Sequence, residues 1–208
     1  MNPIMTMALA KGTKQLVAEA RSLLTKLAGP AAEEAGLLLQ DKVKLRRFKN
    51  QLRILSKAQQ LLVDAKLLPA PVPLRTLVPL LEGAALEEDE GLSDKWACLL
   101  ANAGAQNVSL ATHPAFPRLL SEMTPGEACF LDRLSHSGGS AEWESFRETV
   151  KKAMAVSREQ IDRDYNNLDR LGVCRIVRKK QTGKTIVEIS PFGLVFLKAC
   201  SPPTSMPA

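Results

Sequence analysis

The chain has 208 residues, of which 45% are apolar, 4% are aromatic and 24% are charged. This length holds one medium domain or two small ones, and the composition is that of a soluble globular protein whose core is built mainly from leucine and alanine. It excludes a membrane-spanning helix, because no stretch approaches the roughly 20 apolar residues that such a helix needs.

The formal charge of +6 is unevenly distributed along the chain. Residues 1–66 carry a net charge of +7, residues 67–124 carry −4 and residues 125–208 carry +3. A basic, acidic, basic order can reflect contact between the blocks, so the overall charge alone is weak evidence for a nucleic-acid partner.

The cysteines are far apart and form no CxxC pair, so neither a zinc ribbon nor a redox motif is supported. They are Cys98, Cys129, Cys174 and Cys200. The first residues lack the basic region of a secretory signal, so we expect a cytoplasmic protein with reduced core thiols and neither a cofactor nor a metal.

Residues 14–28 place leucine and alanine on one side and charged residues largely elsewhere, which predicts an amphipathic helix. Gly29 and Pro30 end it, and a second helix is expected over residues 31–40. Two interpretations remain open: insertion into a membrane surface, or ordinary packing. Packing is favoured, because interfacial helices usually carry more aromatic residues and a more continuous basic face.

Residues 41–66 predict a helix on which basic and apolar groups are sorted to neighbouring faces. Five cations fall within an arc of about 80° at helical spacing. They are Lys42, Arg46, Lys49, Arg53 and Lys57. Such a row, which we call the α-helical basic row, runs roughly 24 Å and suits phosphates or an acidic protein surface. The alternative, which we weigh more heavily, is that the row faces solvent or pairs with Glu87–Glu90 of the same chain.

Prolines at positions 69, 71 and 73 predict an extended connector. A helix from Leu77 to about Leu86 follows, then four adjacent acids, Glu87–Glu90, interpreted as a solvated connection because they lack calcium-loop spacing. Ser93 or Asp94 is expected to cap a helix that carries Trp96 inward, which completes a helical hairpin.

The run VPLLEGAALEEDEGLSDKWACLLANA, with upstream GPAAEEAG and KVKLRRFKNQLRIL, resembles the Abi-alpha family of bacterial proteins, named for abortive infection. Pro79 to Glu82, Glu87 to Glu90, Trp96 and Asn102 fit the family's leucine-rich segment, acidic break and tryptophan helix ending in asparagine. The resemblance extends from about Gly29 to Cys200. It implies a role in defence against phage, by halting or killing the infected cell, and it carries over no catalytic residue.

The last third predicts a separate module that begins with a capping signature at Thr124, Pro125 and Glu127. Ser140 is expected to cap a second helix and Ser157 a third that ends at Gly172. The β-branched runs VCRIVR and TIVEIS, separated by KKQTGK, indicate a β-hairpin, and an apolar helix follows from about Pro191 to Cys200. This order is that of a winged helix.

The third helix of this module offers polar groups opposite its apolar stripe, of types that hydrogen-bond base edges or phosphates. They are Arg163, Asn166, Asn167 and Arg170, and the predicted wing adds Arg178, Lys179, Lys180 and Lys184. Four acids on or beside this helix, Glu159, Asp162, Asp164 and Asp169, would repel phosphate. A protein contact or a structural role is therefore the stronger alternative to nucleic-acid binding.

We expect a mainly α protein in which an N-terminal helical bundle over residues 1–122 precedes a winged-helix-like α+β module over residues 123–201 and a disordered tail at 202–208. Neither His113 nor His136 lies in a catalytic motif, so we expect no enzyme. The first functional hypothesis is a non-enzymatic defence effector or sensor that binds an anionic partner, nucleic acid or an acidic protein. A membrane-active toxin using residues 14–40 and a winged-helix DNA-binding transcription regulator are the alternatives. The candidate partners are nucleic acid, an acidic protein, a membrane surface and further copies of the chain in a homo-oligomer.

Overall fold

The 20-residue helix α3 (Leu45–Asp64) sorts its apolar residues to one face, and that face forms one wall of a helical core. The computed structural model describes residues 18, 19, 22, 23, 25–27, 45–106, 113–179 and 183–204. These residues form two compact units. Unit 1 comprises residues 1–121 and 199–208, and unit 2 comprises residues 122–198.

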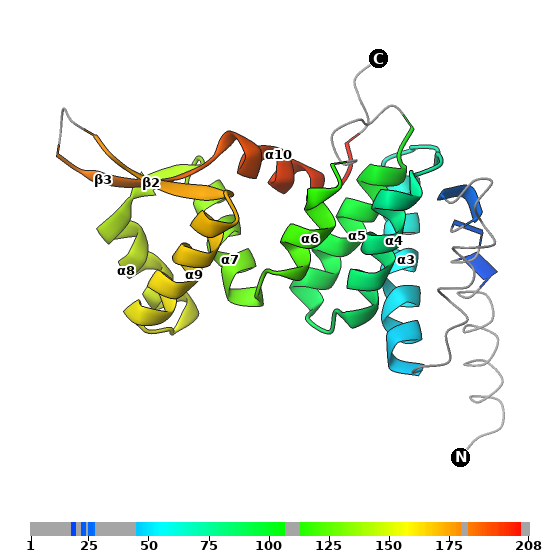
Figure 1. Ribbon diagram of the computed structural model, residues 1–208, viewed down its shortest axis with the longest axis horizontal. Coiled ribbons are helices and arrows are strands. Elements are labelled where there is room, and N and C mark those ends of the chain that lie inside the picture. The colour runs from blue at the N-terminus through cyan, green and yellow to red at the C-terminus, as the bar shows by residue number, and fades with distance from the viewer. Residues whose placement is uncertain are drawn as a thin grey trace. The chain divides into compact units, whose positions relative to one another are not determined.

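In unit 1, α3 packs against α4 (Leu74–Leu86) and α5 (Glu90–Gly104), and α4 also contacts the short helix α6 (Ala115–Ser121) (Figure 1). The fully buried side chains are mostly leucine, with one tryptophan, which suits the aromatic-poor composition. The core includes Ile54, Leu55, Leu62, Leu77, Leu80, Leu81, Trp96 and Leu99. Mainly helical structure, predicted from this leucine pattern, is confirmed.

The first predicted helix is confirmed where the structure describes it, since the described residues between 18 and 27 are helical. Leu23 and Leu27 are fully buried, and the Leu27 carbonyl accepts a hydrogen bond of 2.6 Å from the Val72 backbone. These two leucines therefore pack in unit 1, as the packing interpretation expected. The second predicted helix, residues 31–40, lies outside the described residues.

Unit 2 begins with α7 (Pro125–His136), whose predicted capping box is confirmed: the Thr124 hydroxyl accepts from the Glu127 backbone and the Glu127 carboxylate accepts from the Thr124 backbone. The next helices are α8 (Trp143–Met154) and α9 (Arg158–Arg170), and Ser157 caps α9 as predicted. Aromatic rings join these helices, since Phe130 contacts Phe146 edge-on at 5.1 Å and Trp143 lies 5.1 Å from Tyr165.

The predicted hairpin is confirmed as β2 (Cys174–Arg178) and β3 (Thr185–Ile189), which pair antiparallel with Arg175 opposite Glu188. A third strand, β1 (Ser140–Glu142), pairs with β3 on its other edge, so the sheet order is β1-β3-β2. The expectation that Ser140 caps α8 is therefore wrong: its backbone lies in β1 opposite Glu188, and α8 begins at Trp143 with no side-chain cap.

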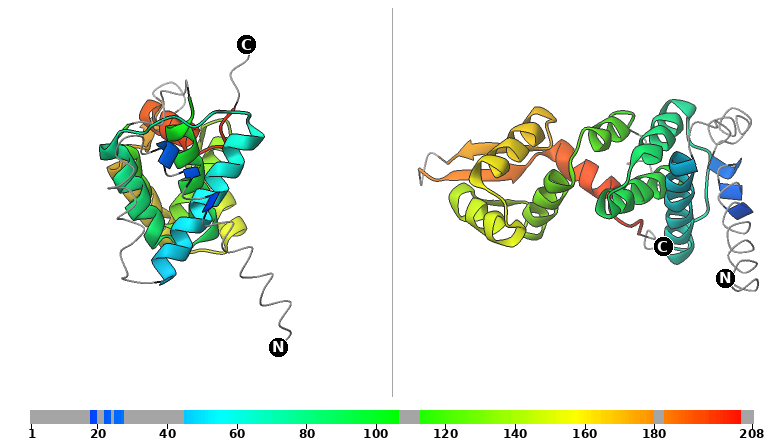
Figure 2. Two further views of the ribbon diagram at one scale, coloured as in Figure 1. Left: turned by 90° about the vertical axis from the view of Figure 1, so that its right-hand side faces the viewer. Right: turned by 90° about the horizontal axis from the view of Figure 1, so that it is seen from below.

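The hairpin lies alongside the helices of unit 2, with β2 against α9 and β3 against α8 (Figures 1 and 2). Gly139, with φ +80°, turns the chain into β1, and its carbonyl accepts a 2.8 Å hydrogen bond from Ile189. The predicted last helix is α10 (Pro191–Ala199). Of the expected tail, residues 202–204 are described and Pro203 is buried, whereas residues 205–208 lie outside the described part.

Candidate functional site

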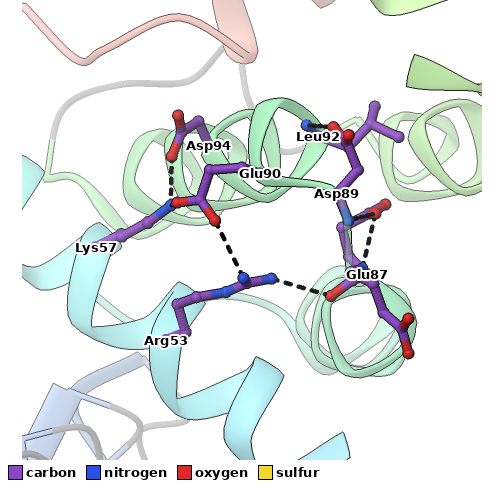
Figure 3. Close-up of polar contacts among 8 residues, drawn as sticks. Arg53, Lys57, Glu87, Asp89, Glu90, Leu92 and Asp94 are labelled. Carbon is purple, nitrogen blue, oxygen red and sulfur yellow. Dashed lines mark hydrogen bonds and ion pairs between the residues drawn. The ribbon is translucent and has the colours of Figure 1, made fainter. Parts of the chain in front are cut away.

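Two members of the α-helical basic row, Arg53 and Lys57, face the start of α5 instead of an open surface (Figure 3). Arg53 Nη1 lies 3.1 Å from Glu90 Oε2, and Lys57 Nζ lies 2.6 Å from Asp94 Oδ1 and also contacts Glu90 Oε1. The side chains of Arg53 and Lys57 are 33% and 29% exposed. The internal pairing that the sequence left open is thus observed for these two cations, and we remove them from the candidate anion site.

Polar side chains of α3 also bind the carboxyl end of α4. Asn50 donates to the Ala85 carbonyl, Gln51 to the Leu81 carbonyl, and Arg53 Nη2 to the Glu87 carbonyl, each at 3.2 Å. The last carbonyls of a helix have no partner within it, so Asn50 and Arg53 satisfy groups at the end of α4 that would otherwise need solvent, and Gln51 binds a carbonyl one turn earlier. This face of α3 therefore stabilises the α4–α5 connection.

The other three members of the α-helical basic row are Lys42, Arg46 and Lys49. Lys49 is exposed on α3. Lys42 lies outside the described residues, and for Arg46 only the backbone is described. Their role in binding an anion stays a prediction.

The acidic connection is shorter than predicted, because α5 begins at Glu90. Asp89 is its N-cap: Asp89 Oδ1 accepts from the Leu92 backbone at 2.9 Å, and Glu87 Oε1 accepts from the backbones of Glu88 and Asp89 (Figure 3). The expectation of a cap at Ser93 or Asp94 is therefore wrong. The Asp89 carboxylate, one turn earlier, already accepts a hydrogen bond from a free backbone N–H group at the start of α5. Its negative charge also interacts favourably with the positive end of the helix dipole.

In unit 2, the outermost face of α9 carries the predicted polar residues. Arg163, Asn166 and Arg170 are exposed, and Ile161 and Leu168 on the opposite face are fully buried. The Arg163 guanidinium is exposed and donates to the Gln160 side chain, a neutral partner, and its charge also acts on the nearby Asp164 carboxylate. These three side chains lie along one stripe of the helix, as the 3.6-residue period requires.

Asn167, predicted with this group, instead holds α9 to α7. Its amide donates to Glu127 Oε1 at 2.8 Å and to the Glu122 carbonyl at 3.3 Å. Arg170 donates to Glu122 Oε2 at 2.8 Å and to Asn167 Oδ1. Because Glu127 is buried, its carboxylate needs the Asn167 amide as a donor, and we remove Asn167 from the candidate site.

The acids that argue against phosphate binding at α9 have partners of their own. Both carboxylate oxygens of Asp162 accept from Arg147 Nη1, at 2.9 and 3.2 Å. The pKa of Glu159 is lowered because its carboxylate accepts from its own backbone and from Ser157 at the start of α9. Asp164 is buried and accepts from Gln160 Nε2 at 2.6 Å. Of these acids, Asp162 has a cationic partner, which reduces its repulsion of an approaching phosphate, whereas Glu159 and Asp164 accept from neutral groups and keep their charge.

The hairpin places further cations at its open end. Arg178, Lys179 and Lys184 are exposed, and the Lys179 and Lys184 backbones close the last rung of the hairpin at 2.9 Å. Lys180 lies outside the described residues. Sequence reasoning missed Arg175, which pairs with Glu188 across the strands at 2.7 Å. The pairing follows from the hairpin register, which places the two residues opposite each other and which the sequence alone did not fix.

A family model described as abortive infection alpha matches residues 40–200, which is most of the chain. The chain belongs to the abortive infection alpha family. The predicted resemblance is thereby confirmed, and membership suggests abortive-infection defence for this family protein. Neither the comparison with curated proteins nor that with solved structures returned a match.

Three further findings concern the described part of this abortive infection alpha protein. None of its described helices combines the length and the apolar character needed to cross a bilayer. Among the same residues, no three His, Cys, Asp or Glu side chains converge as metal ligands would. Burial raises the pKa of Cys98 to about 11 and that of Cys174 to about 12.

Proposed function

We propose that this abortive infection alpha protein is a non-enzymatic defence factor that binds nucleic acid through unit 2. The observation that carries the proposal is the combination, within one unit, of the outward stripe of α9 with the exposed cations at the end of the hairpin. The α-helical basic row is a weaker candidate, because Arg53 and Lys57 are used inside unit 1.

The element order of unit 2 supports the interpretation of this unit as winged-helix-like. Three helices are followed by an antiparallel hairpin, and a short strand between the first two helices completes the sheet. In helix-turn-helix relatives, the last of three helices contacts nucleic acid. In this chain that position is α9, whose partners on α7 and α8 leave its outer stripe exposed.

A direct test measures binding of the full chain to a mixed-sequence DNA duplex over a range of salt concentrations, with the double variant Arg178→Ala/Lys179→Ala. If both cations bind phosphates, the slope of log K against log salt becomes shallower by about 0.9 for each phosphate that the variant no longer neutralises. The matched control is Lys66→Ala/Arg75→Ala, which removes two exposed cations from unit 1 and should leave the slope unchanged.

Two results would contradict nucleic-acid binding through unit 2. One is the absence of any binding by the wild-type chain at low salt. The other is an equal loss of affinity in both double variants. Binding would then depend on the net charge of the chain and not on the cations of unit 2.

The defence role is tested in infected cells. Cells that carry the gene should restrict phage while infected cells die at high phage dose, and Arg178→Ala/Lys179→Ala should lose this protection at unchanged protein level. Protection that persists in this variant would separate defence from the proposed surface. Binding to one discrete operator with no effect on phage yield would favour the transcription regulator.

A further inference from the structure

We infer that the nucleic acid is double-stranded DNA in the B form, contacted from the major groove by α9, with Arg163 and Asn166 at the base edges. This inference rests on the proposed function and names the class of ligand for the same surface. Three observations support it: the exposed residues along one stripe of α9, the side-chain contacts that fix α9 to its neighbours, and the burial of the aromatic rings of unit 2.

The outer stripe of α9 has the length and the chemistry for a groove. The helix has 13 residues, about 20 Å, and its stripe exposes Glu159, Arg163, Asn166 and Arg170 in turn. An arginine can bind guanine O6 and N7 with two hydrogen bonds, and an asparagine can bind adenine N6 and N7. Arg163 and Asn166 lie at the middle of this stripe, where a helix seated in a groove comes closest to the bases.

The helix is held on both flanks, so it can enter a groove as a rigid element. On one flank Asn167 and Arg170 are bonded to Glu127 and Glu122, and on the other Asp162 is bonded to Arg147 of α8. The Arg147 guanidinium also lies 5.6 Å from the Trp143 ring centroid. A pre-positioned helix loses little conformational entropy when it binds, which favours base contacts over loose phosphate contacts.

The negative groups on or beside the stripe have hydrogen-bond partners within unit 2. The Glu159 carboxylate is stabilised at the amino end of its own helix, and the Tyr165 hydroxyl is hydrogen-bonded to Asp169. With Asp162 bonded to Arg147, Arg163 is the cation at the middle of the stripe, while Glu159 and Asp169 stay exposed and charged toward its two ends.

In the described part of unit 2, no Phe, Trp or Tyr ring is exposed as a platform for unstacked bases. Phe130, Trp143, Phe146 and Phe196 are buried, and Tyr165 and Phe192 are partly covered. Proteins that bind single strands usually stack bases on exposed aromatic rings. The major groove of an RNA duplex is deep and narrow and excludes a helix, whereas that of B-form DNA, about 12 Å wide, admits one.

The first experiment compares binding of the full chain to a DNA duplex, an RNA duplex and a single DNA strand of equal length at one low salt concentration. We expect the DNA duplex to bind most tightly. Equal affinity for all three would overturn this inference and leave the proposed function standing. Tighter binding of the RNA duplex or the single strand would also overturn it, and no binding of any of the three would overturn the proposed function itself.

The second experiment selects duplexes from a randomised DNA library with the wild-type chain. We expect an enriched motif that contains guanine or adenine, and Arg163→Ala or Asn166→Ala should weaken binding to it by about 5- to 150-fold each, the discrimination of one bidentate base contact. The matched control is Arg158→Ala, which removes an exposed cation from the same helix, one already paired with Glu148. It should bind the motif as the wild type does.

Replacing guanine in the enriched motif by 7-deazaguanine removes the N7 acceptor from the major groove without changing the backbone. We expect weaker binding of the wild-type chain and no further weakening of Arg163→Ala. An enriched motif that both Arg163→Ala and Asn166→Ala still bind with wild-type affinity would overturn the assignment of these residues. If the library yields no enriched motif, the surface binds phosphates without reading bases. That result would also overturn the assignment of Arg163 and Asn166 to base edges.

Discussion

Lys57 on α3 and Asp94 on α5 are joined by an ion pair of 2.6 Å, although 37 residues separate them in the sequence. Glu90 adds a second carboxylate to the same ammonium group. The ion pair fixes the start of α5 against the middle of α3. It occupies Lys57, which the sequence analysis had named as a candidate for binding an external anion.

A double-mutant cycle of Lys57→Ala and Asp94→Ala should give a coupling energy of about 0.2–1 kcal/mol, because both side chains are partly exposed. Urea unfolding measures it, and the coupling should shrink in high salt. Lys49→Ala with Asp94→Ala is the control and should be additive. A coupling energy that salt does not change would contradict an ion pair.

The same pair predicts a dependence on alkaline pH. Partial burial acts to lower the pKa of Lys57, but its hydrogen bonds to Asp94 and Glu90 outweigh burial and raise the pKa above 10.5. Because the folded-state pKa lies above the unfolded one, the stabilisation is complete below pH 10.5 and is lost as pH rises through the folded-state value. Unfolding of wild type and Lys57→Ala across this range should converge at high pH.

Replacing Asn102 should loosen the attachment of residues 199–204 to α5 within unit 1. The Asn102 amide donates to the carbonyls of Ala199 at 2.9 Å and Ser201 at 2.7 Å. Asn102→Ala leaves both carbonyls without this donor and should cost about 1–3 kcal/mol, and Asn102→Asp should cost more because its oxygens face theirs. Urea unfolding and hydrogen exchange at residues 199–204 measure this, with exposed Asn166→Ala as the control. Unchanged exchange there would refute the role.

Alanine should have opposite effects at two glycines of unit 1. A Cβ on Gly83 would lie 2.2 Å from Cη2 of the buried Trp96 ring, so Gly83→Ala should destabilise by about 1–3 kcal/mol. At Gly91 the nearest atom is Asp89 Oδ1 at 3.3 Å, and alanine there gains helix propensity at an exposed position. Thermal unfolding compares the two. A Gly83→Ala variant as stable as the wild type would show that the Trp96 ring moves aside without cost.

Gly193→Ala should destabilise unit 2, because a Cβ at this position would lie 2.0 Å from the Val173 carbonyl oxygen. A backbone atom cannot move aside as the end of a side chain can, so we expect a loss of about 1–3 kcal/mol or more. Leu194→Ala, at a neighbouring side chain that is 52% exposed, is the control and should change stability little. A soluble Gly193→Ala variant with wild-type stability would contradict this close contact of α10.

Asp164→Asn should stabilise the protein at neutral pH. Burial raises the pKa of Asp164 above 3.8, and its hydrogen bond from Gln160 only partly opposes this. A carboxyl group whose folded-state pKa is raised makes stability fall as pH rises from the unfolded to the folded value. Asparagine keeps the acceptor for Gln160 and removes the charge, so urea midpoints of the variant should vary less between acid and neutral pH. A variant less stable than wild type at neutral pH would contradict the prediction.

Much of the local structure was predictable because it depends on neighbours in sequence. The capping box of Thr124 and Glu127, the cap at Ser157 and the two strands around KKQTGK were all predicted correctly from short patterns. The strand at Ser140–Glu142 was not, because three residues carry no periodic signal and their partner, β3, begins more than forty residues later. Ser140 resembles a cap until that partner is known.

The amino-acid sequence by itself determined the helical class, the family and the sorting of basic and apolar residues along α3 and α9, since each depends on spacing along one element. Only the tertiary structure decided which cations remain available. It paired Arg53 and Lys57 with Glu90 and Asp94, committed Asn167 to Glu127, and left Arg163 and Asn166 facing outward. The reason is that a charge pattern records which groups share a face, and only packing brings to that face the opposite charges that cover it.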